Sequence, residues 1–474
     1  MSPEELEDLE RADQQGAEDK REQFDEENRL KADFIREVSD ALDDGDEGRV
    51  YELVEPLHPA DIADLFELIE RGERGKLAAA ITDLMSSEVF AELNDHVRES
   101  MVEELAPEAV AEIAEQLETD DAVQLIEDLD KEDQEAVLAE MDPEDRAAIE
   151  SALSYPEETA GRLMQRELIA VPEHMNVGQL IDYLRENEEL TTEFWEVFIV
   201  DPTHRPVGTC ALSWILRAPR HVALTDVMKR DQTLIPVSMD QEEVALLFQK
   251  YALISAAVVD EVGRLVGQLT VDDIVHIIQE EAGEDVLLLS GAGDGDINEP
   301  IRLTIRTRLV WLVVNLGTAM VASSVVGLFQ GVIAKFALLA VLMPIVSGMG
   351  GNAGTQTLAV VVRALATNQL TASNTWRMIG REFAIATANG LALGALIGTG
   401  VALVFGNVLL GVVIASAMLI NNLVAGSAGI LVPLTLERFR VDPAVSSAVF
   451  VTMATDVMGF FSFLGLATLS GLAN

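Results

Sequence analysis

The sequence predicts a multidomain membrane protein with an α-helical solenoid, two α/β modules, a connecting helix and a five-helix transmembrane domain, in that order. Three observations lead to this fold class: a short helical repeat in an acidic first half, a longer duplication that alternates strands and helices, and five long apolar stretches from Leu309 onward. Only four of the 81 acidic residues follow residue 301, so the two halves require separate interpretation.

Residues 1–48 form an acidic segment that we expect to be disordered or helical. From Met1 to about Asn28 the chain is rich in Glu, Asp and Gln and has no apolar run, which argues against a signal peptide. Residues 49–158 carry a repeat with a period of 12, marked by Leu105, Leu117, Leu129 and Met141. Proline near the first helical turn, as at Pro107 and Pro143, and apolar residues at helical spacing predict short stacked helices.

A second duplication spans residues 159–220 and 221–282. The run Phe198-Ile199-Val200-Asp201 is echoed by Ala257-Val258-Val259-Asp260, and a Val-Gly pair follows each run. Each unit predicts strand, helix, strand, strand, helix, and the pair resembles tandem CBS domains. Some domains of that class bind adenine nucleotides through Thr-x-x-Asp, as at Thr270 and Asp273; the alternative is that Thr270 only caps a helix.

A connecting helix is expected at residues 283–308, and the transmembrane domain at 309–474. Five stretches are long enough to cross about 30 Å of hydrocarbon, near 309–331, 336–362, 383–405, 408–436 and 444–470. Basic residues cluster before the first span, between the second and third, and between the fourth and fifth. The positive-inside rule therefore predicts a cytoplasmic N-terminal half and an external C-terminus.

The net charge of −49 excludes nucleic acid as a natural partner and favours cations, which concentrate near clustered carboxylates. A salt-adapted surface is an alternative cause of the acidity, but it explains none of the membrane features. Cys210 is the single cysteine, so the chain has neither a disulfide framework nor a thiolate metal cluster.

One acid, Asp456, lies near the middle of an apolar run. A carboxylate costs roughly 2.5 to 3.5 kcal/mol at the bilayer centre, so such a residue usually faces water, an ion or a partner charge. The alternative is a structural hydrogen bond to Thr455 or Asn422. All six histidines precede the spans, which leaves oxygen donors there and favours Mg²⁺ over Zn²⁺ or Cu²⁺.

The second span contains a run rich in glycine and polar residues, from Pro344 to Gln356. Two interpretations stay open and are compatible: tight helix packing through small residues, or a loosened helix whose carbonyls and Asn352 line an ion path.

Several motifs in the spans together resemble the MgtE family of magnesium channels. They are Gly-Gly-Asn-x-Gly-x-Gln at residues 350–356, Arg-Ala-Leu-Ala-Thr at 363–367, Asp-Pro-Ala at 442–444 and Thr-Asp-Val-x-Gly at 455–459. The resemblance implies a homodimer in the lipid of the inner membrane. It also implies that Asp456 is the pore carboxylate, that Asp442 sits at the cytosolic mouth and that Asn352 shapes the path.

The resemblance further implies that cytosolic Mg²⁺ closes the pore by binding between the acidic domains. Carboxylates around the last helix of the second CBS module have spacings that fit such a sensor, and others in the repeat are opposing candidates. The expected sensor ligands are Asp273, Glu281, Glu284, Asp285, Glu242, Asp120 and Asp121. Bound Mg²⁺ would offset their repulsion and favour a closed state.

Two alternatives to Mg²⁺ transport remain: transport of Co²⁺, Mn²⁺ or another divalent cation, and a membrane-anchored cation sensor that conducts nothing. An anchor has no need of a buried carboxylate, so Asp456 argues against the sensor. The sequence has no phosphate-binding Gly-x-x-x-x-Gly-Lys loop and no convergent nucleophile and base, and we therefore expect no enzymatic activity.

Overall fold

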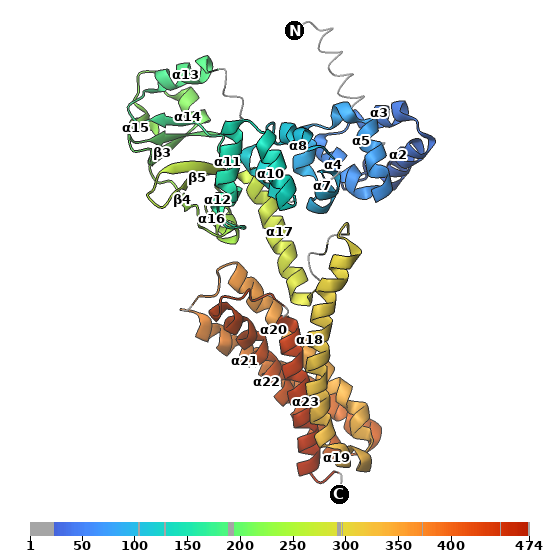
Figure 1. Ribbon diagram of the computed structural model, residues 1–474. Helices are drawn as coiled ribbons and strands as arrows, with labels where there is room; N and C mark the ends of the chain where they lie inside the picture. The colour runs from blue at the N-terminus through green and yellow to red at the C-terminus, as the bar shows by residue number, and fades with distance from the viewer. Residues whose placement is uncertain are drawn as a thin grey trace, which may run out of the picture. The chain divides into compact units, whose positions relative to one another are not determined.

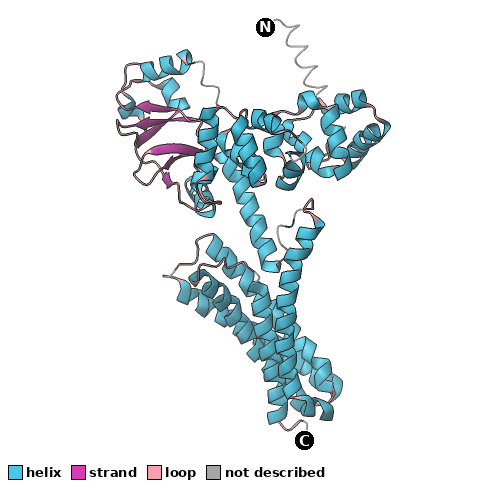
Figure 2. Cartoon of the chain, in the orientation of Figure 1, coloured by secondary structure: helices cyan, strands magenta, loops and turns pink. Residues whose placement is uncertain are grey.

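A computed structural model describes residues 23–102, 105–127, 129–187, 194–291, 295, 297–371, 373–445 and 447–472 (Figure 1). The chain divides into two compact units, residues 1–277 and 278–474. Within the described residues all strands belong to the first unit, and the second is helical (Figure 2). Of residues 1–48, expected to be disordered or helical, residues 1–22 lie outside the described part. The rest includes the helix Ala32–Asp44, whose apolar side chains join the core of the helical domain, so that domain begins before residue 49.

The first unit opens with short helices that share one apolar core. They are α2 (Ala32–Asp44), α3 (Glu47–Val54), α4 (Pro59–Leu68), α5 (Arg71–Ala80), α6 (Ser87–Glu92), α7 (Asp95–Val102), α8 (Pro107–Ala114), α9 (Thr119–Glu127), α10 (Lys131–Glu140) and α11 (Pro143–Leu153). The last four begin two residues after the repeat positions Leu105, Leu117, Leu129 and Met141. The predicted stack of short helices is confirmed.

Two three-stranded sheets follow, with the orders β1-β2-β3 and β4-β5-β6. In each, the first strand pairs in parallel with the second and the second antiparallel with the third. The strands are β1 (Ala170–Pro172), β2 (Glu196–Val200), β3 (Pro206–Ala211), β4 (Leu234–Pro236), β5 (Ser255–Val259) and β6 (Leu265–Thr270), and the helices are α12 (Ala160–Leu163), α13 (Val177–Glu186), α14 (Leu212–Arg217), α15 (Leu224–Val227) and α16 (Gln241–Tyr251). The duplicated α/β modules are therefore confirmed.

The recurring glycine of the duplication has a packing reason. A Cβ on Gly208 would lie 2.7 Å from Sδ of Met228, and one on Gly267 would lie 2.7 Å from Sδ of Met164. Each glycine thus makes room for the methionine that lies before the first strand of the other module, and the two modules are interlocked by equivalent contacts.

Helix α17 (Val271–Ser290) continues from the second module without a break. It ends before Gly291, whose φ of +67° lies in the left-handed region that glycine adopts readily. The next helix, α18 (Ile301–Leu328), begins directly after Pro300. The segment 283–308, expected as one connecting helix, is thus divided between α17 and α18, because the glycine-rich run 291–295 and Pro300 separate them.

Five helices of the second unit are long and apolar enough to cross a membrane. They are α18, α20 (Leu338–Ala366), α21 (Thr375–Phe405), α22 (Val408–Arg438) and α23 (Ser447–Leu469), and the short α19 (Gln330–Lys335) joins the first two. The five predicted spans are confirmed. Helices α18 and α21 each begin before their predicted spans. The spans were predicted from apolar residues alone, and both helices start in polar segments that contain arginines.

Candidate metal centres

The membrane unit places Asp456 on α23, half-buried, within reach of α20. Its Oδ1 accepts a hydrogen bond from the hydroxyl of Ser347. The alternative expected from the sequence, a bond to Thr455 or Asn422, does not occur: the Thr455 hydroxyl donates to the carbonyl of Thr452, and the Asn422 amide donates to that of Met418. Asp456 is therefore held by another span.

One face of α20 is open in the single chain. Pro344, Gly348, Asn352 and Gln356 recur every four residues along it, and all four are exposed. This spacing puts them on one side of the helix. Amide side chains facing hydrocarbon are costly, so this stripe is suited to a water-filled path or to another protein surface.

The opposite face of α20 is packed. A Cβ on Gly350 would lie 2.0 Å from Nδ2 of Asn421, and one on Gly354 would lie 2.5 Å from Cγ1 of Val451. Tight packing and an open polar stripe therefore occupy different sides of the same helix. The expected loosening of the backbone is not seen: α20 is α-helical from Leu338 to Ala366, because close contacts at its glycines support it on the packed side.

Asp442 is exposed in the turn before α23, and its Oδ1 accepts a hydrogen bond from the backbone N–H of Ala444. This hydrogen bond holds the Asp442 carboxylate near the N-terminal end of α23, close in sequence to Arg438 and Arg440. Asp442 thus lies just before α23 and Asp456 on it, a sequence separation that corresponds to roughly four helical turns.

The first unit brings acids of the helical domain to the second α/β module. Asp120, in the first turn of α9, is 7% exposed, and its buried Oδ1 has no hydrogen-bond partner among the residues that the structure describes. Burial raises the pKa of the Asp120 carboxyl well above its usual value, and the charges of Asp273, Asp121 and Glu118 raise it further. A buried carboxylate among other acids is stabilised when it binds a proton or a cation.

The pKa values of two neighbouring carboxyls are raised as well. Burial, followed by the charges of Glu167 and Asp273, raises the pKa of Glu118 to about 7. Burial also raises the pKa of Asp273 to about 6, although a hydrogen bond from Thr270 opposes the change. We call Glu118, Asp120, Asp121, Asp272 and Asp273 the interdomain acid cluster.

The other sensor candidates lie elsewhere. Glu242 is in the first turn of α16, which Asp240 caps. Glu281 and Glu284 follow Asp273 on α17, in the second unit, and the side chain of Asp285 lies outside the described part. Of the expected sensor ligands, the structure therefore brings together Asp120, Asp121 and Asp273.

Comparison with known proteins agrees with this layout. Residues 57–158 match the model of the MgtE intracellular N domain, residues 224–280 that of the CBS domain, and residues 343–466 that of MgtE, described as a divalent cation transporter. The magnesium transporter MgtE of Bacillus subtilis is 30% identical over 321 residues, which are 68% of this chain and 71% of that protein. The chain belongs to the MgtE family.

A second MgtE relative, from Thermus thermophilus, is 32% identical over 325 residues, which cover 68% of this chain and 72% of that protein. A solved structure of the cytosolic domain of the Mg²⁺ channel MgtE in complex with ATP is 29% identical and covers 51% of this chain and 99% of that one, with a TM-score of 0.47. The family predicted from the sequence motifs is confirmed.

In this MgtE family member the Thr-x-x-Asp pair is internally bonded. The Thr270 hydroxyl donates to Oδ2 of Asp273, and Nε2 of Gln165 donates to the same oxygen at 3.0 Å. Asp273 therefore takes part both in this bonded group and in the interdomain acid cluster.

Sequence reasoning missed two members of the cluster, Glu118 and Asp272, together with the nearby Glu167 and one acid of the membrane unit. Glu118 precedes Asp120 in the repeat, and Glu167 receives hydrogen bonds from the N–H and hydroxyl of Thr119. Glu382 on α21 is 5% exposed and accepts a bond from Thr357 at 3.4 Å. Glu382 was overlooked because it lies just before the apolar run of the third predicted span. Its spacing of four residues from Ala386 places the two on the same face of α21, and this spacing could have indicated that Glu382 is buried.

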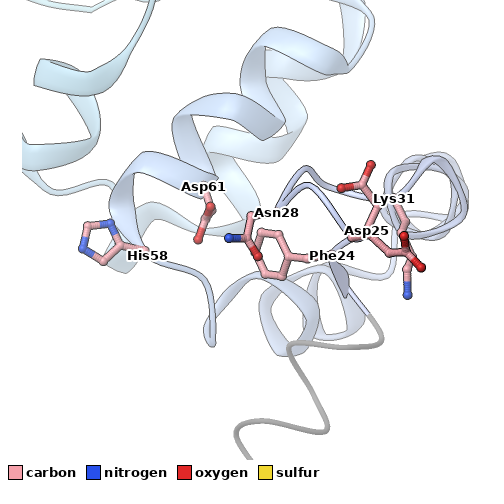
Figure 3. A pocket seen from close by; sticks show the side chains of 7 residues that line it. Phe24, Asp25, Asn28, Lys31, His58 and Asp61 are labelled. Carbon is pink, nitrogen blue, oxygen red and sulfur yellow. The ribbon is translucent and has the colours of Figure 1, made fainter. Parts of the chain in front are cut away.

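A pocket of about 790 Å³ lies in the helical domain, away from these residues. Figure 3 shows four of the lining residues: His58 at the N-cap of α4, Asp61 in the first turn of that helix, and Phe24 and Asn28. Its polar groups already serve local structure: Nδ1 of His58 accepts from the Ala60 N–H, and Asp25 accepts from the N–H groups of Glu27 and Arg29. None of the expected ion ligands lines it.

Proposed function

We propose that this protein carries Mg²⁺ across the inner membrane through a path that includes Asp456, and that cytosolic Mg²⁺ closes the path by binding at its acidic domains. The proposal of transport rests on the half-buried Asp456 beside the open polar stripe of α20, in a chain whose residues 343–466 match the model of a divalent cation transporter. Relatives that bear the name magnesium transporter support Mg²⁺ as the cargo.

The donor set favours Mg²⁺. Around the path the side chains offer carboxylate, hydroxyl and amide oxygens from Asp456, Ser347 and Asn352, and no histidine or cysteine follows residue 276. Mg²⁺ prefers oxygen ligands and keeps several of its waters, which suits a site with few carboxylates. Co²⁺ and Mn²⁺ are the alternative cargo.

A homodimer is part of the proposal. The open stripe Pro344, Gly348, Asn352 and Gln356 would face lipid in a single chain, and only 6% of the apolar window of α18 is buried within its own chain. A two-fold axis beside α20 would set two stripes and two Asp456 carboxylates around one path and would balance the charge of a divalent cation.

Regulation rests on the interdomain acid cluster. Without a cation, the charges of Asp120 on α9 and Asp273 on α17 repel, and Asp120 Oδ1 has no donor in the described part of the chain. A bound Mg²⁺ would offset that repulsion and favour the compact arrangement. Asp442, Asn352, Glu242, Glu281, Glu284 and Asp285 remain predicted ligands. An adenine nucleotide at Thr270 and Asp273 remains a weaker prediction, because both side chains are internally bonded.

The test is Mg²⁺ flux into liposomes that carry the purified protein, with Mg²⁺, Co²⁺ and Mn²⁺ offered separately. We expect Mg²⁺ flux that Asp456→Ala abolishes. A protein that compacts with Mg²⁺ but gives no flux of any of these ions would instead be the membrane-anchored sensor.

A further inference from the structure

The hydroxyl of Ser347 differs from other serine hydroxyls in the membrane helices. Ser324 and Ser427 donate to the carbonyls of Met320 and Leu423, four residues earlier in their own helices. Ser347 on α20 donates instead to Oδ1 of Asp456 on α23. A hydroxyl that donates a hydrogen bond to a carboxylate on another helix makes a charge-assisted bond, which is stronger than a bond to a carbonyl.

The backbone that carries Ser347 is itself fixed from a third helix. Asn421 on α22 is fully buried, and its Nδ2 donates to the carbonyl of Val346 at 2.8 Å. The same amide lies against Gly350 of α20 and Gly459 of α23, where an added Cβ would approach Nδ2 to 2.0 and 2.9 Å. Asn421 therefore holds α20 and α23 at the level where Ser347 meets Asp456.

We propose that Ser347 is a positioning and selectivity residue for Asp456: it occupies Oδ1, and so presents Asp456 to the cation through its other oxygen. This inference rests on the proposed role of Asp456 in the path. A carboxylate with one oxygen engaged binds a cation or its water shell through the other oxygen, which suits Mg²⁺. Ca²⁺ gains more from a carboxylate that offers both oxygens, because it takes six to eight ligands in flexible geometry.

The experiment compares Ser347→Ala and Ser347→Thr with Ser427→Ala in the full-length protein in liposomes. Ser427→Ala is the matched control, since it removes a half-buried membrane hydroxyl that bonds only within its own helix. The measured quantities are the half-saturating Mg²⁺ concentration, the maximal flux and the concentration of Ca²⁺ that halves Mg²⁺ flux.

Losing a bond to a charged group changes binding by roughly tenfold or more. We expect Ser347→Ala to raise the half-saturating Mg²⁺ concentration about tenfold and to make Ca²⁺ inhibit at about tenfold lower concentration. Ser347→Thr keeps the hydroxyl and should stay close to wild type, as should Ser427→Ala.

The outcomes separate this inference from the proposed function. If Asp456→Asn removes flux while Ser347→Ala behaves like Ser427→Ala, Asp456 is in the path and the role of Ser347 is overturned. A fall in maximal flux alone, with unchanged Mg²⁺ and Ca²⁺ dependence, means that Ser347 serves only packing and also overturns it. If Asp456→Asn leaves flux intact, the proposed path itself fails.

Discussion

Asp273, at the start of α17, lies close enough to Asp120 of the helical domain to raise the pKa of the buried Asp120 carboxyl. The two residues belong to different domains of the first unit, and acids surround both. Their repulsion destabilises the contact between the domains whenever both are ionised. Protonation of either carboxyl, or a cation bound between the two, would relieve this repulsion.

The first prediction concerns pH. The pKa of Glu118 is raised to about 7 and that of Asp273 to about 6, so the folded state holds protons that the unfolded state releases near pH 4. Stability should therefore be highest at low pH within this window and should fall as the pH rises from about 4 to about 7. Thermal unfolding of the full-length protein without divalent cations measures this. A stability that rises over the same interval contradicts the assigned cluster.

The second prediction concerns Asp120→Asn. Removing this charge should raise the unfolding temperature in the absence of Mg²⁺ and reduce the further increase that Mg²⁺ produces, because less repulsion remains for the cation to offset. Asp133→Asn is the control, since Asp133 is exposed in the first turn of α10. An equal response of both variants to Mg²⁺ would show that Asp120 contributes nothing to cation binding.

The third prediction concerns Gly350. Its Cβ would meet Nδ2 of Asn421 at 2.0 Å, so Gly350→Ala must displace Asn421 or separate α20 from α22. Overpacking of this kind costs about 1 to 3 kcal/mol. Gly400→Ala, at a helical position with open space around it, should be neutral or slightly stabilising. Unfolding in detergent compares the two, and equal stability would mean that the packed face of α20 is misassigned.

The fourth prediction concerns Glu382. This carboxyl is 5% exposed and accepts a hydrogen bond from the hydroxyl of Thr357. Glu382→Gln keeps the shape and a hydrogen-bond acceptor for Thr357 while removing a buried charge, so it should be at least as stable as wild type. Glu382→Ala leaves a cavity beside Thr357 and should be less stable. A large loss of stability in Glu382→Gln would reveal a charge partner that binds there.

Composition and periodicity predicted the architecture because each domain has its own signal. A 12-residue repeat indicated the short helices, the recurring Val-Gly pair marked the interlocked modules, and apolar length gave the spans. The contacts across helices had no such signal. Ser347 and Asp456 are far apart in the sequence, and the bond between them depends on the packing of Asn421 against Gly350 and Gly459.

The sensor was predicted less completely than the spans. Asp120, Asp121 and Asp273 were expected as opposing ligands, and the structure brings them together. Glu118 was overlooked because an acid just before a short amphipathic helix usually faces solvent, and only tertiary packing decides which acid is buried. Sequence spacing placed Glu281 and Glu284 on the same helix as Asp273, and their role as ligands stays a prediction.

The central claim is that Asp456 lies in a Mg²⁺ path that cytosolic Mg²⁺ closes. The most direct test is Mg²⁺ flux through oriented liposomes, for wild type and Asp456→Asn, while Mg²⁺ on the side of the acidic domains is raised stepwise. The account predicts wild-type flux that falls as this Mg²⁺ rises, and no flux in Asp456→Asn at any concentration. Equal flux in both proteins, or wild-type flux that is indifferent to Mg²⁺ on that side, would contradict it.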